Sequence, residues 1–88
     1  MSGEHDEATA IGSVTHYFGH LSVAAVSLTD TLRVGDRIHI KGHTSDLEQT
    51  VDSMEVDHQR VDEAGPGDDV ALRVEDHVRE HDRIYREG

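Results

Sequence analysis

Two stretches of similar pattern decide the fold: RVGDRIHI at residues 33–40 and AGPGDDVALRV at residues 64–74. Each places a turn of Gly and Asp before a short strand in which apolar and polar residues alternate. Alternation with a period of two puts one face of a strand against a core and the other toward water. The repeated unit therefore predicts a small antiparallel β-domain.

Segments on both sides of these stretches continue the pattern and predict about six strands. The expected strands fall in residues 11–18, 21–28, 37–41, 46–58, 70–74 and 84–85. Their inward residues include Val26, Ile38, Ile40, Val56 and Leu72. Sheets this small leave exposed edges unless they close on themselves. We predict an all-β fold, a small closed six-stranded antiparallel barrel, with at most one short helical turn near residues 76–81.

The longest expected strand, residues 46–58, changes phase in its middle. Leu47 and Val51 fall on odd positions, whereas Met54 and Val56 fall on even ones. A strand cannot change face without an extra residue, so a β-bulge is expected near residues 52–53. Residues 1–9 are polar and aperiodic and predict a disordered lead-in. Residues 10–87 then form a single β-barrel domain.

Length and composition bound the class of protein. A chain of 88 residues supports one modest core. It has no cysteine, which excludes disulfides and thiolate chemistry. No apolar run reaches the roughly 18 residues of a membrane span, and the N-terminus is acidic. We expect a soluble cytoplasmic protein with no membrane partner.

The chain carries a net charge of -11, from 19 acidic and 8 basic residues, and Lys41 is its one lysine. The acids are spread over every expected strand rather than gathered in a tail. Adaptation to high salt explains this balance, because at molar salt the Debye length falls to about 3 Å and repulsion weakens. An ordinary acidic protein is the alternative. In high salt, net acidity does not exclude a nucleic-acid partner.

Four features, in this order, resemble the second domain of the translation elongation factor Tu family, a six-stranded β-barrel. They are VGDRIHI at residues 34–40, the bulged strand at 50–56, DEAGPGDDV at 62–70 and EHDRIY at 80–85. The resemblance covers about residues 22–87. The form also looks like short relatives of that domain, which include the C-terminal barrel of some collagenase-like peptidases of the tRNA-hydroxylation type.

The resemblance implies an RNA-binding or ligand-binding face. In that family the bulged strand and the following turn hold the aminoacyl-adenosine end of tRNA. Glu55 stands where the family has a contacting glutamate, Asp69 where it has an asparagine and His58 where it has an arginine. Asp57 replaces an aromatic residue that could stack on a base. The alternative is that Glu55 and Asp69 are solvated surface carboxylates.

Other polar groups give weaker signals. Arg37, His39 and Lys41 form an outward basic stripe, either a phosphate track or partners of neighbouring acids. His77 and His81 would share one face of a helical turn, where two imidazoles can hold zinc. Outward histidines in place of lysines are the simpler interpretation, so we predict no metal and no cofactor. The chain has no G-x-x-x-x-G-K-[ST] loop and no G-x-S-x-G elbow, so we expect neither GTP binding nor catalysis.

Together these expectations describe a non-catalytic translation-factor-like β-barrel module, not an enzyme. Its partner would be RNA, a ribonucleoprotein, or a protein of the translation or tRNA-modification machinery. A protein–protein adaptor barrel with no RNA contact is the alternative. A metal-dependent enzyme using His77 and His81 is the third hypothesis.

Overall fold

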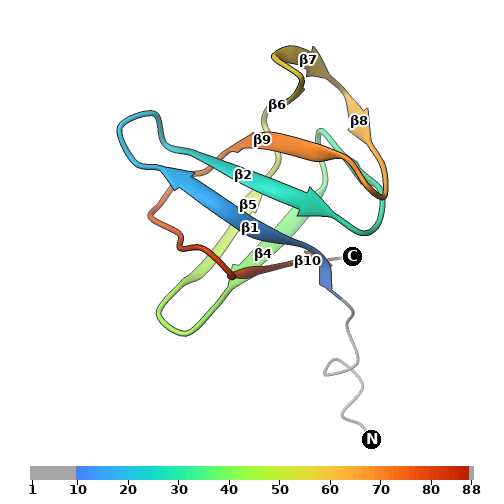
Figure 1. The fold of residues 1–88 in the computed structure, drawn as a ribbon. Helices are drawn as coiled ribbons and strands as arrows, with labels where there is room; N and C mark the ends of the chain where they lie inside the picture. Colours follow the sequence, from blue (N-terminus) through green and yellow to red (C-terminus); the bar gives the residue numbers. More distant parts are fainter. Residues whose placement is uncertain (1–9, 88) are drawn as a thin grey trace, which may run out of the picture.

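The computed structural model describes residues 10–87, which form ten β-strands and no helix (Figure 1). The strands are β1 (Ala10–Phe18), β2 (Val23–Leu28), β3 (Leu32–Arg33), β4 (Arg37–Lys41), β5 (Asp46–Thr50), β6 (Met54–Val56), β7 (Gln59–Val61), β8 (Glu63–Ala64), β9 (Asp69–Arg73) and β10 (Arg83–Glu87). The lead-in predicted for residues 1–9 lies outside the described part. In that part, no helix has the length and apolar character needed to cross a membrane.

Eight strands form one curled antiparallel sheet in the order β5-β4-β10-β1-β2-β9-β6-β7, and β3 pairs with β8 separately. The predicted all-β class is confirmed. The predicted closed six-stranded barrel is wrong, because the hydrogen-bonded order begins at β5 and ends at β7 without joining them. Figure 1 shows the sheet curling round, with β4 and β5 on the opposite side from β9. The architecture is a curled half-barrel.

The strand expected over residues 46–58 is two strands, which accounts for part of the difference in strand number. β5 ends at Thr50 and pairs with β4, whereas β6 begins at Met54 and pairs with β9 and β7. The phase change read from the sequence thus falls where the chain leaves one end of the sheet and joins the other. The segment expected to connect strands, residues 61–64, instead contributes to β7 and β8. Short pairings of this kind carry little periodic signal.

The helical turn allowed near residues 76–81 is absent from the described chain. The segment between β9 and β10 is irregular until Arg79, where the Asp82 amide donates to the Arg79 carbonyl at 3.2 Å. The Asp82 carboxylate accepts a hydrogen bond from the Arg79 amide at 2.8 Å. The Asp82 side chain therefore takes the place of the backbone carbonyl that would accept from this amide in a helix. Val78 is buried in this segment and anchors it to the core.

The core lies inside the curl. Val26, Ile38, Ile40 and Leu72 are completely buried, as predicted. Val56 is only partly buried, because it lies at the end of β6 beside the hairpin turn. Alternating exposure along β4 and β9 confirms that each Gly-Asp unit is followed by a strand with one inward face.

The same aspartate turn precedes three strands. In each turn, the Asp carboxylate accepts a hydrogen bond from the backbone amide of the residue three positions earlier. The backbone amide of the Asp donates a hydrogen bond back to the carbonyl of that same residue. The pairs, with the two distances, are Arg33–Asp36 (3.0 and 3.1 Å) before β4, Gly65–Asp68 (2.9 and 3.1 Å) before β9, and Arg79–Asp82 (2.8 and 3.2 Å) before β10. The repeat read from the sequence is therefore a repeated turn geometry.

A buried amide joins β5 to the end of β9 and to the chain just after it. Gln49 Nε2 donates to the Arg73 carbonyl at 2.9 Å, and Gln49 Oε1 accepts from the Glu75 amide at 2.8 Å. The side chain of Gln49 is almost fully buried. Four strands separate β5 from β9 in the sheet order, so curling of the sheet brings these groups together. The Gln49 side chain thus bonds to the Arg73 carbonyl and the Glu75 amide, as the backbone of a neighbouring strand would do.

Candidate functional site

A groove of about 480 Å³ lies on the outer face of the sheet, over β1, β2, β6 and β9. We call it the Ala71 groove. Its lining residues are Phe18, Leu21, Val23, Ser53, Glu55, His58, Ala71 and Arg73. Four strands, two turns and the connection between β5 and β6 contribute, so the groove exists only in the folded sheet.

Strand register explains the hollow. Ala71 on β9 lies opposite Ala25 on β2 and opposite Glu55 on β6. Because these two neighbouring alanines have short side chains, the middle of the outer face is a shallow depression. In the next outward row, Val23 lies between Phe18 and Arg73. Larger side chains therefore border a floor of small ones.

One border of the groove is apolar and exposed. The exposed fraction is 37% for Phe18 and 59% for Leu21. The Phe18 ring packs against the His16 ring with centroids 4.5 Å apart. Leu21 lies in the β1–β2 turn, where its amide donates to the Phe18 carbonyl at 3.0 Å. An exposed apolar pair beside a hollow is typical of an interaction surface.

The opposite border is polar. Asp57 and His58 form the two-residue connection between β6 and β7, and both have positive φ angles (53° and 65°), as tight hairpin turns require. This turn presents His58 to the groove. Glu55 and Arg73 supply an acceptor and donors of opposite charge. The groove therefore offers apolar contact on one side and hydrogen bonding on the other.

The structure brings together two of the three site residues predicted from the sequence. Glu55 and His58 both line the Ala71 groove. Asp69 lies at the start of β9 opposite Ser27, two residues before Ala71 and on the same outward face, and it does not line the groove. Sequence reasoning missed Phe18, Leu21 and Arg73, because only strand pairing brings them near Glu55.

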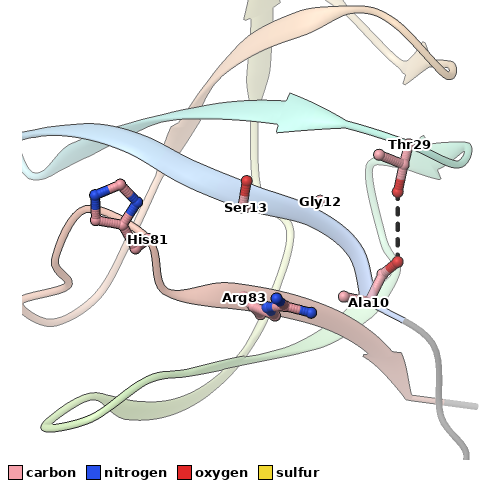
Figure 2. A pocket seen from close by; sticks show the side chains of 6 residues that line it. All are labelled: Ala10, Gly12, Ser13, Thr29, His81 and Arg83. Atoms are coloured by element: carbon pink, nitrogen blue, oxygen red, sulfur yellow. Dashed lines mark hydrogen bonds between the residues drawn. The ribbon is translucent and has the colours of Figure 1, made fainter.

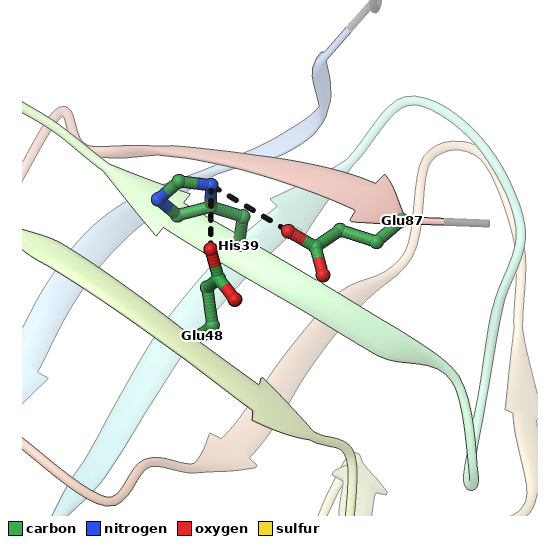
Figure 3. Close-up of side chains that lie close together, drawn as sticks. All are labelled: His39, Glu48 and Glu87. Carbon is green, nitrogen blue, oxygen red and sulfur yellow. Dashed lines mark ion pairs between the residues drawn. The ribbon is translucent and has the colours of Figure 1, made fainter.

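Acids surround most of the predicted basic stripe. The Arg37 guanidinium lies 3.8 Å from Glu48 and 3.8 Å from Glu87. His39 lies near the same two carboxylates (Figure 3). It also contacts Asp46. Lys41 lies at the end of β4, opposite Asp46 and Arg83 in the register. The acids come from β5 and β10, which flank β4 on either side.

A second, more polar groove of about 380 Å³ lies along β1 and β10, where their register shifts between Ala10 and Gly12 (Figure 2). Thr29 Oγ1 donates to the Ala10 carbonyl at its edge, at 3.4 Å. His81 and Arg83 also line it. The His77 ring instead packs on Tyr17, with centroids 4.6 Å apart. Without a helical turn, the spacing of His77 and His81 does not bring their imidazoles onto one face.

Comparison with known proteins gives relatives of one kind. No family model matches the chain. It is 38% identical over 76 residues to an uncharacterized protease of Methanocaldococcus jannaschii, covering 85% of this chain and 19% of that protein. It is 32% identical over 87 residues to a collagenase of Porphyromonas gingivalis, covering 97% of this chain and 24% of that enzyme. The chain thus spans about a fifth to a quarter of these curated relatives.

Solved structures give the same fold. Two crystal structures of the C-terminal domain of a Geobacillus thermoleovorans protein described as a U32 peptidase superpose with TM-scores of 0.82 and 0.84. They are 19% and 20% identical to this chain, and they match over 98% and 93% of their own length. At this identity the likeness establishes the fold. Nearly all of the isolated domain corresponds to this one chain.

These relatives correct the expectations drawn from the resemblance. Assignment to the elongation factor Tu domain 2 family is wrong, because the relatives are U32 peptidase and collagenase proteins. The translation-factor-like, RNA-associated function is overturned by the same names. The expectation that the chain stands apart from enzymes is likewise overturned, since its curated relatives are a protease and a collagenase. Gly-Asp turns and alternating strands report local turn geometry and burial, so they could not decide between one family and another.

Proposed function

We propose that this chain works as the C-terminal-type domain of a U32 peptidase system and that its Ala71 groove binds polypeptide for the catalytic part. The similarity to a protease over 85% of the chain carries the proposal. The near-complete match to an isolated C-terminal domain supports the role of a separate folding unit. The partner would be a peptidase catalytic domain, and the ligand an unfolded or extended segment of its protein substrate.

The chemistry of the groove supports a polypeptide ligand. Leu21 and Phe18 give an apolar border that can accept an aliphatic or aromatic side chain. Glu55, His58 and Arg73 give donors and acceptors for backbone amides and polar side chains. Peptide recognition combines these two kinds of contact, apolar pockets for side chains and hydrogen bonds for the main chain.

A binding measurement with matched variants tests the groove. Fluorescently labelled gelatin peptides are titrated with the chain, and anisotropy gives the affinity. Leu21→Ser removes an apolar contact worth about 1.5–3 kcal/mol when buried, so binding should weaken about tenfold or more. Leu21 is exposed in the free chain, so the folding stability should hardly change.

The control is Val34→Ser. Val34 is also an exposed large apolar residue, at 39%, but it lies outside the groove, between β3 and β4. Its substitution should leave the affinity within about twofold of the parent chain, because surface changes away from a site have small effects. Equal loss in both variants, or no saturable binding by the folded parent chain, would rule out the groove as the peptide site.

A further inference from the structure

We propose that His39, Glu48 and Glu87 form a binding site for one divalent first-row cation, with Zn²⁺ as the best-matched ion. The three side chains come from neighbouring strands β4, β5 and β10 and converge on the outer face of the sheet, away from the Ala71 groove (Figure 3). Among residues 10–87 they are the group of three whose possible ligand atoms all lie within 4.8 Å of one another. The site is independent of the proposed peptide binding.

Strand register fixes the three positions. Glu48 lies directly opposite His39 in the β4–β5 pair. Tyr85 lies opposite His39 in the β4–β10 pair, so Glu87, two residues further along, is the diagonal neighbour on the same face. Direct and diagonal neighbours are within reach of long side chains such as glutamate. The ligand set therefore lies on three hydrogen-bonded strands rather than on a loop.

The two glutamates aim oxygens at one imidazole nitrogen. Glu48 Oε2 lies 3.8 Å and Glu87 Oε2 lies 3.7 Å from His39 Nδ1. These separations are too long for hydrogen bonds. Two ligand atoms at tetrahedral zinc, with bonds of about 2.1 Å, lie about 3.4 Å apart. Small rotations of the glutamates would bring the three atoms around one ion, with water as the fourth ligand.

The other nitrogen of the imidazole is already held. His39 Nε2 contacts Asp46 Oδ1. When a carboxylate accepts a hydrogen bond from Nε2–H, Nδ1 carries the lone pair, and here that nitrogen faces the two glutamates. Protein zinc sites use the same arrangement of carboxylate, histidine and metal. This contact holds the ring so that Nδ1 faces Glu48 and Glu87. Asp46 acts here as a positioning residue.

The local charges also suit a divalent ion. The remaining oxygens, Oε1 of Glu48 and Oε1 of Glu87, each lie 3.8 Å from the Arg37 guanidinium. Three carboxylates and one guanidinium leave two negative charges, which one divalent cation balances. The exposed fraction of the His39 side chain is 22%, so the site is shielded on one side and open to an entering ion on the other. One imidazole with two carboxylates is a ligand set that Zn²⁺ accepts.

Titration of the metal-free full chain with Zn²⁺ alone tests this site, followed by calorimetry and by NMR of the imidazole nitrogens. We expect one saturable event in which the His39 resonances shift and those of His43, an exposed histidine four residues away, do not. Glu48→Gln and Glu87→Gln should each weaken binding at least tenfold. Asp46→Asn should weaken it about 10–100-fold, the usual effect of losing a supporting carboxylate.

Two matched variants serve as controls. Glu63→Gln removes an exposed glutamate that pairs with Arg33 across β3 and β8, and His43→Ala removes the neighbouring histidine. Both should bind Zn²⁺ like the parent chain. Several weak events spread over the histidines, adventitious binding only, would overturn the proposal. The same conclusion would follow if Glu48→Gln and Glu87→Gln, with well-dispersed spectra, bound the ion as tightly as Glu63→Gln.

Discussion

At the scale of single residues, the side chain of Gln49 makes a connection that no sequence pattern reveals. Gln49 lies in phase with Leu47 and Val51, on the inward face of its expected strand, and its buried amide bonds to the backbone of Arg73 and Glu75. Those partners lie 24 and 26 residues further along the chain. Local alternation contains no information on such a distant pairing. The inward valines, isoleucines and leucines, by contrast, could be predicted because burial follows period two.

Gln49→Leu should destabilise the fold by about 1–3 kcal/mol, because a carbonyl and an amide would lose their partner in a buried place. Chemical denaturation gives the free energy of unfolding. Gln59→Leu is the matched control, since Gln59 is exposed on β7 and should change stability by less than about 0.5 kcal/mol. Equal stability of Gln49→Leu and the parent chain would show that this amide is not a structural link.

At the scale of elements, the three aspartate turns set where strands β4, β9 and β10 begin. The Gly-Asp patterns before β4 and β9 were recognisable in the sequence because glycine and aspartate have specific turn roles. The third turn, Arg79–Asp82, lacks a glycine and was expected as a possible helical turn instead. Its Asp82 is buried, with only 4% exposed. Adding a Cβ to Gly42 would place it 1.8 Å from Asp82 Oδ1, so this turn packs closely on the β4–β5 connection.

Alanine substitutions at two of the turn aspartates and at the exposed Asp69 should destabilise the chain in a defined order. Asp82→Ala should cost most, about 1–3 kcal/mol, because the Arg79 amide loses its partner beside a buried side chain. Asp68→Ala should cost about 1 kcal/mol, since its turn is only partly buried. Asp69→Ala, at the exposed neighbouring position, should have almost no effect. Thermal unfolding of the three variants checks the order, and a larger effect for Asp69 than for Asp82 would refute it.

At the scale of the whole molecule, the sequence predicted an all-β chain but not the open curl, and it put the elongation factor Tu family before the collagenase-like peptidases that the comparisons give. The division of residues 46–58 between two ends of the sheet depends on pairing partners that periodicity cannot specify. Among the residues that line the Ala71 groove, Glu55 and His58 were singled out through the resemblance, whereas Leu21 and Phe18 were expected as ordinary strand residues. Shape at this scale is created by register, which places alanines 25 and 71 side by side.

An exchange within the Porphyromonas gingivalis collagenase tests most directly whether this chain acts as a peptidase-type domain through its Ala71 groove. The collagenase segment that aligns with the chain, 24% of the enzyme, is replaced by this chain, and gelatin cleavage is measured in a buffer where the chain is folded. We predict cleavage within a few-fold of the parent enzyme. Leu21→Ser in the inserted chain should lower it about tenfold, and Val34→Ser should not. Cleavage no faster than that of the enzyme lacking the segment, or equal rates for the two variants, would show that the chain does not act through this groove.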